Sequence, residues 1–75
     1  MKQMVYTVQA YKFGHRDGSS YIVGVYAKKH AALKASEAEE IYRGNKYICE
    51  VCESELNISN RDKQPKVIKA LEYPL

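Results

Sequence analysis

A chain of 75 residues forms one small domain, and such a chain buries only about 60% of the surface that it exposes when unfolded. So thin a core leaves little room for a buried catalytic apparatus, and it makes a homodimer an expected source of additional stability. The formal net charge of +3 divides into +4 for residues 1–30 (five basic, one acidic), −3 for 31–56 (three basic, six acidic) and +2 for 57–75 (four basic, two acidic), which argues against a generally basic nucleic-acid binder.

The sequence has neither the apolar run that a membrane-spanning segment needs nor the cysteines that a disulfide scaffold needs. No apolar run approaches the roughly 20 residues that span a bilayer. The N-terminal segment MKQMVYTVQA becomes strand-like too early for a secretory signal, and two cysteines are too few for a disulfide scaffold. We therefore expect a cytoplasmic protein that makes no membrane contact.

The N-terminal third predicts a β-hairpin. Residues 4–13, MVYTVQAYKF, alternate and are rich in β-branched and aromatic side chains, which indicates a strand. The polar segment 14–20 follows as a loop, and 21–27, YIVGVYA, is a second strand. Gly24 interrupts that strand, and we interpret it as a position where a bulge, a crossing helix or another backbone needs the missing side chain.

The helix is predicted over residues 28–43, KKHAALKASEAEEIYR, which are dense in Ala, Lys and Glu. Gly44-Asn45 supplies a left-handed stop. A step of roughly 100° per residue places Leu33 on the outer side. The same step predicts a buried face of small residues that lets the helix lie close above Gly24, made of Ala31, Ala35, Ala38 and Tyr42 with Ile41 at its margin.

Residues 47–56 form the third predicted strand, which contains Cys49-x-x-Cys52. An odd separation puts the two side chains on opposite faces of a sheet, so we expect both to behave as small apolar side chains. The tail around residues 66–73 fits a fourth strand, a short helix or an extended arm, and we favour the strand or arm. The fold class is α+β, an antiparallel sheet of three or four strands with one helix on one face, with 1–57 as the β-β-α-β domain and 58–75 as an extension.

A small zinc-binding protein is one alternative. His15 and His30 are the histidines available to complete a four-ligand site with the two cysteines, but no second ligand pair has the usual knuckle spacing. We expect no metal and no cofactor.

A phosphate or nucleic-acid binder is a second alternative. Free backbone N–H groups at the start of the helix, next to a poor N-cap at Ala27, can hold an anion. Added positive charge there comes from Lys28, Lys29, His30 and Lys34. Tyrosines of the sheet would supply stacking surfaces, although the basic and aromatic signature of an RNA-recognition sheet is missing.

Protein contact is the interpretation that we favour. Tyrosine, of which the chain has seven, is effective at protein interfaces, and glutamates on an exposed sheet suit a basic partner. No arrangement of residues resembles a catalytic triad, a phosphate loop or a carboxylate pair, so we expect no enzyme activity. The candidate contacts are Tyr11, Arg16, Tyr26, Leu33, Glu50, Glu53 and Glu55.

The segment SYIVGVYAKKHAALKASEAEEIYRGNKY resembles small β-β-α-β domains of unknown function found in phage and bacterial genomes. Shared features are a hairpin ending in Val-Gly-Val-Tyr/Phe, a helix of the form Lys-x-x-Ala-x-x-Ala and an acidic third strand that begins with Tyr. The resemblance covers roughly residues 4–57; members usually have Ser or Thr where this chain has Ala27, and the tail after Asn57 lies outside the pattern. It implies a fold and no activity. A phage origin implies a small inhibitor in a bacterial cytoplasm that covers a surface of a host protein, such as a defence nuclease.

Overall fold

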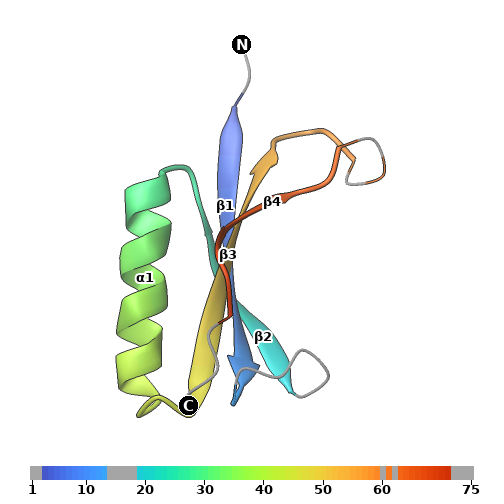
Figure 1. Ribbon diagram of the computed structural model, residues 1–75. Coiled ribbons are helices and arrows are strands. Elements are labelled where there is room, and N and C mark those ends of the chain that lie inside the picture. Colours follow the sequence, from blue (N-terminus) through green and yellow to red (C-terminus); the bar gives the residue numbers. More distant parts are fainter. Residues whose placement is uncertain (1–2, 14–18, 60, 62, 72–75) are drawn as a thin grey trace.

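The computed structural model describes residues 3–13, 19–59, 61 and 63–71, and these form one antiparallel sheet with one helix (Figure 1). The elements are β1 (Met4–Lys12), β2 (Ser20–Tyr26), α1 (Lys29–Tyr42), β3 (Tyr47–Glu55) and β4 (Lys66–Lys69). The predicted α+β class is therefore confirmed, and the C-terminal tail contributes a fourth strand. In the part of the chain described, no helix has the length and apolar character needed to cross a membrane.

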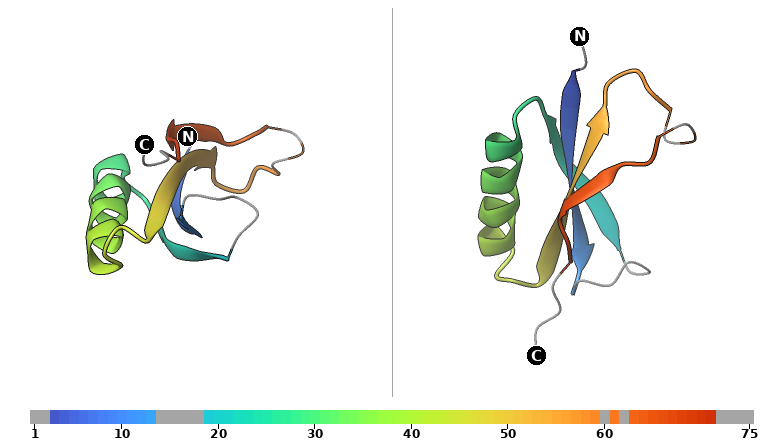
Figure 2. Two further views of the ribbon diagram at one scale, coloured as in Figure 1. Left: turned by 60° about the horizontal axis from the view of Figure 1, so that its bottom comes forward. Right: turned by 45° about the horizontal axis from the view of Figure 1, so that its top comes forward.

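The strand order is β2-β1-β3-β4, so β1 and β3 form the centre of the sheet. Both β2 and β3 pair antiparallel with β1 and therefore run in the same direction. The connection between them is α1, which crosses β1 on one side of the sheet. Two further views show that the helix covers one face and that no described helix covers the other (Figure 2).

The core lies between α1 and the two central strands. Alternation sends the even residues of β1 and the odd residues of β3 toward the helix, where Val8 pairs with Val51 and Ala10 with Cys49. Together with Ala32 of α1 these side chains are fully buried. All five are small, so α1 lies close on the sheet and the core contains little apolar volume.

The predicted buried face of the helix is wrong by about one residue. Ala32 and Ser36 are buried, whereas Ala31, Ala38 and Tyr42 are exposed and Ala35 is half-buried. One residue is a rotation of about 100°. The cause is polar: Glu39 and Glu40 both turn toward the sheet to accept hydrogen bonds, and an apolar pattern does not detect such contacts.

Leu33 is also misplaced by the sequence pattern. It is half-buried and packs against the core cluster, so the prediction that it projects to the outer side of the helix is wrong. The rotation of the helix explains the error, because Leu33 follows Ala32 on the face that meets the sheet.

Gly24 has a structural use. It lies beside a bulge of β2 against β1, one of the predicted uses, and its nearest neighbour is a side chain of its own strand and not the helix. A Cβ at Gly24 would lie 2.8 Å from the Tyr26 hydroxyl and 3.0 Å from its ring. Tyr26 therefore leans back along β2 over the space that glycine leaves, and it packs against the core cluster.

The C-terminal end of the helix agrees with the sequence prediction, and the N-terminal end differs from it by one residue. Gly44 and Asn45 have φ of 63° and 62°, the predicted left-handed stop. At the other end the N-cap residue is Lys28 and not Ala27, and it makes no side-chain capping hydrogen bond.

Candidate interaction surface

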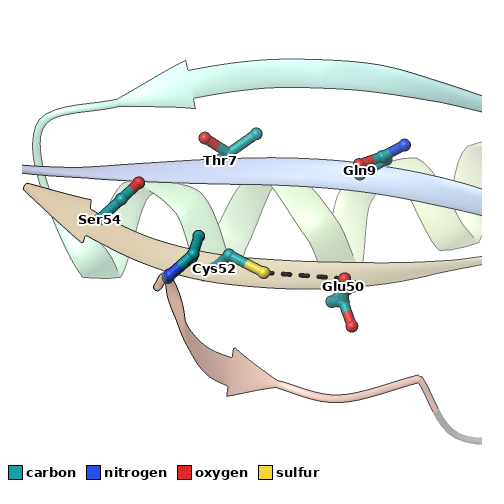
Figure 3. A pocket seen from close by; sticks show the side chains of 6 residues that line it. Thr7, Gln9, Glu50, Cys52 and Ser54 are labelled. Carbon is teal, nitrogen blue, oxygen red and sulfur yellow. Dashed lines mark hydrogen bonds between the residues drawn. The ribbon is translucent and has the colours of Figure 1, made fainter. Parts of the chain in front are cut away.

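The sheet face opposite α1 is the candidate surface, and we refer to it as the open face. Alternation assigns to it the odd residues of β1 and the even residues of β3. A shallow hollow of about 190 Å³ lies over these two strands (Figure 3). Its lining consists of Thr7, Gln9, Glu50, Cys52, Ser54 and Pro65.

One row of side chains crosses all four strands on this face. Thr7 pairs with Val25 on one side and with Cys52 on the other, and Cys52 pairs in turn with Val67. Directly paired residues of antiparallel strands point to the same side, so these four side chains form one continuous line. We refer to it as the open-face row. Strands about 4.8 Å apart give it a length of about 14 Å.

The ends of the open-face row are apolar and exposed. Val25 is 60% exposed and Val67 is 46% exposed, and Ile22 next to Val25 is also 60% exposed. The centre is half-buried and polar or weakly polar, at Thr7 and Cys52. Ile22 and Val25 form a small exposed apolar patch at the β2 end of the row, and Val67 is a single exposed apolar side chain at the β4 end.

The hollow is too small for most small-molecule ligands. Pockets for such ligands usually have about 300–1,000 Å³, whereas this one has about 190 Å³. That volume fits one or two side chains of a partner, and it does not enclose a substrate.

The two cysteines lie on opposite faces, as predicted. Cys49 is buried against Ala10 under the helix, and Cys52 lines the hollow, where its thiol donates to Glu50 at 3.7 Å. Burial, with Glu40 nearby, raises the pKa of the Cys49 thiol to about 11. The described residues hold no group of three His, Cys, Asp or Glu side chains placed for a metal ion, and His15 lies outside them.

The tyrosines that the structure describes do not form a stacking platform on the open face. Tyr6, Tyr21, Tyr26 and Tyr47 pack against the core cluster on the helix side. Tyr11 does face the opposite way, but it is only 8% exposed. Alternation places Tyr6 of β1 and Tyr47 of β3 on the helix side, and the register shift of β2 against β1 brings both Tyr21 and Tyr26 to that side as well.

Three tyrosines instead surround Arg43 at the end of α1. The guanidinium lies 5.2 Å from the ring centre of Tyr21 and 5.5 Å from the ring centres of both Tyr42 and Tyr47. Its Nε donates to the Tyr21 hydroxyl at 3.0 Å and to Glu39 at 3.1 Å. These contacts fix the helix end to β2 and β3, so the rings serve the fold.

Tyr21 also donates a hydrogen bond to Glu39. This bond is the main cause of a lowered pKa for the Glu39 carboxyl, and Arg43 acts in the same direction. Burial, followed by the bond to Glu39, raises the pKa of Tyr21. Both shifts favour the charged glutamate with a neutral tyrosine.

The predicted acidic contacts are partly occupied within the molecule. Glu53 accepts a hydrogen bond from the Tyr6 hydroxyl at 2.9 Å, which raises the pKa of that tyrosine. Glu55 pairs with Lys63 at 3.5 Å. Glu50 is only 5% exposed and faces the hollow, on the side of β3 opposite to Glu53 and Glu55. The three glutamates therefore do not form one ladder.

The remaining predicted contacts fall in different places. Tyr11 is buried, and Tyr26 and Leu33 are half-buried against the core, which leaves them little free surface. Arg16 lies outside the described residues.

The basic group at the helix start is exposed, and it consists of Lys28, Lys29, His30 and Lys34. The N-terminus of α1 has no side-chain capping hydrogen bond. The sequence predicts a poorly capped helix start, although with Ala27 and not Lys28 at the N-cap. On the open face, by contrast, none of the described strand residues is basic.

Sequence reasoning missed the open-face row itself. Thr7, Val25 and Val67 belong to segments far apart in the chain, and each is an ordinary strand residue alone. Alternation within each strand can be read from the sequence. The strand order, which joins these residues into one row, cannot be read from it.

Comparison of the chain with protein-family models, curated proteins and solved structures found no significant match.

Proposed function

We propose that this protein is a non-catalytic interaction module that binds another protein on its open face. The observation that carries the proposal is the open-face row, Val25-Thr7-Cys52-Val67, with exposed apolar side chains at both ends. Burial of these apolar side chains by a partner is favourable, because it removes apolar surface from water.

The chemistry of this face favours a protein over a nucleic acid. Phosphate recognition depends on lysine and arginine side chains and, for single strands, on exposed aromatic rings. The described strand residues of the open face supply neither basic side chains nor exposed rings. A complementary partner has apolar side chains for the two ends of the row and donors for its polar centre.

Inhibition of a larger protein is the specific role that the resemblance to phage domains favours. A small rigid face of this kind acts by covering a surface that its target needs, and it requires no chemistry of its own. The contacts of Arg43 with Tyr21 and Tyr47 attach the end of the helix to the sheet and support the sheet from the side opposite the open face.

The test is affinity capture from lysate of the source host with matched variants, followed by mass spectrometry. Thr7→Lys and Val67→Lys each add one lysine to the open face, and Ala38→Lys adds the same group to the exposed outer side of α1. Capture is repeated with nuclease and at raised salt. We expect one protein that the parent and Ala38→Lys retain through both treatments and that both open-face variants lose.

Retention of that protein by the open-face variants would refute the choice of face. Recovery of nucleic acid that salt removes, and that Lys28→Ala/Lys29→Ala abolishes, would transfer the function to the helix start.

A further inference from the structure

The two edges of the sheet are protected to very different degrees. β4 is four residues long, and Lys66 and Lys69 stand at its two ends. Short length and lysines are common means of preventing an edge strand from pairing with another chain. β2, the other edge, has seven residues, SYIVGVY, with no charge and no proline.

The β2 edge lacks the short length and the lysines that protect β4, and its composition is suited to strand pairing. Its outward N–H and C=O groups have no neighbouring strand among the described residues, because β1 is its one neighbour in the sheet. Ile22 and Val25 are each 60% exposed beside that edge. Valine, isoleucine and tyrosine are also the residues that strands favour.

A bulge makes β2 symmetric about its own centre. The register shifts between Val8 and Gln9 of β1, so that Val23 is the extra residue of β2. Val23 packs against the core, and Gly24 pairs with buried Val8, so both lie on the helix side. Outward from this pair, Ile22 and Val25 lie on the open face, and Tyr21 and Tyr26 lie on the helix side.

We infer that β2 pairs antiparallel with β2 of a second copy, about a two-fold axis between Val23 and Gly24. An isologous contact needs a surface that is complementary to itself. In this register Ile22 lies opposite Val25 of the other copy, and Tyr21 lies opposite Tyr26. Residues of like kind on like faces therefore meet, with no charge opposing a charge.

A second copy also suits the energetics of the chain. The core consists of Val8, Ala10, Ala32, Cys49 and Val51, all small side chains, and oligomerisation is one way in which a domain with so thin a core gains stability. The pairing joins the sheets of two copies into one and places the apolar ends at Val25 side by side. It uses the edge of β2 and does not depend on the proposed partner of the open face.

Sedimentation equilibrium over a range of concentrations tests the inference. We expect the mass of the parent to rise from the 8.6 kDa of one chain toward twice that value. Ile22→Glu and Val25→Lys should each raise the dissociation constant of the dimer by about tenfold or more. An equal mixture of the two variants should restore association, because the introduced glutamate of one copy then faces the introduced lysine of the other.

Val67→Lys is the matched control, since it adds a lysine to the open face on the far edge. It should dimerise like the parent. Amide exchange on the parent needs no variant: protection of Ser20–Tyr26 should increase with concentration, while that of Lys66–Lys69 should not.

Three results would overturn the inference. A parent that stays monomeric up to millimolar concentration leaves the β2 edge to a strand of a different protein. Equal disruption by Val67→Lys assigns the contact to the open face. Failure of the mixed variants to associate refutes the register.

Discussion

Glu40 of α1 accepts a hydrogen bond from the backbone N–H of Cys49 at 2.9 Å, at the point where β4 no longer covers β3. β4 ends at Lys69, opposite Val51, so Cys49 lies beyond the last pair. The other carboxylate oxygen of Glu40 accepts a hydrogen bond from Lys69 Nζ at 3.1 Å, and the same Nζ donates to the Ser36 hydroxyl at 3.0 Å. One carboxylate thus completes the sheet and holds its short edge strand against the helix.

Glu40→Ala should lower the free energy of unfolding by about 1–3 kcal/mol, because it leaves a buried backbone donor without its acceptor. Urea unfolding followed by circular dichroism measures the change. Glu37→Ala, at an exposed position of the same helix, should stay within about 0.5 kcal/mol of the parent. Equal effects of the two variants would contradict the assigned role.

Tyr21→Phe should weaken the dependence of stability on acid. The pKa of Glu39 is lowered, chiefly by the Tyr21 hydrogen bond. Its stabilising contribution is therefore present above the unfolded pKa of about 4.3 and is lost as pH falls through the folded value. The difference between parent and variant, about 1 kcal/mol at neutral pH, should shrink as Glu39 becomes protonated.

Urea unfolding from neutral pH down into the acid range measures that difference. Tyr42→Phe is the control, since Tyr42 is 79% exposed and its ring contacts the same arginine. A constant difference for Tyr21→Phe across the range would show that Glu39 is not the titrating group.

The two thiols should differ in reactivity. Cys49 is fully buried and its pKa is raised to about 11, so little thiolate forms and reagents do not reach it. Cys52 is half-buried at the hollow of the open face. Iodoacetamide labelling of the native protein, read by peptide mass spectrometry, should modify Cys52 first and Cys49 only on unfolding. Equal labelling of both would contradict the burial of Cys49.

Gly24→Ala should displace the Tyr26 ring, because the new Cβ would lie 2.8 Å from its hydroxyl. We expect a loss of about 1 kcal/mol in unfolding free energy. Adding Tyr26→Ala should remove the clash, so the double variant should be more stable than the sum of the two single losses predicts. Thermal unfolding of all four proteins completes the cycle, and strict additivity would refute the contact.

The orientation of the helix can be tested with one pair of variants. Ala32→Leu overfills a position that has no exposed surface and should cost about 1–3 kcal/mol. Ala31→Leu, at the neighbouring exposed position, should be nearly neutral, because leucine is a good helix former. Urea unfolding separates the two, and the reverse order would restore the face predicted from the sequence.

The sequence by itself determined two local properties, the opposite faces of the cysteines and the end of the helix. Alternation along 47–56 was enough to place Cys49 and Cys52 on opposite faces, since neighbouring side chains of any strand point in opposite directions. Gly44 and Asn45 were enough to end the helix, because the left-handed conformation is a property of single residues.

Only the tertiary structure decided how the segments meet. The buried face of the helix differs from the predicted face by one residue because Glu39 and Glu40 accept hydrogen bonds from Tyr21 of β2 and Cys49 of β3. Contacts between separate elements are not visible in the spacing of the helix residues. The strand order joined Val25, Thr7, Cys52 and Val67 into one row. A surface made from four strands depends on pairing between them, and the spacing within each strand does not specify it.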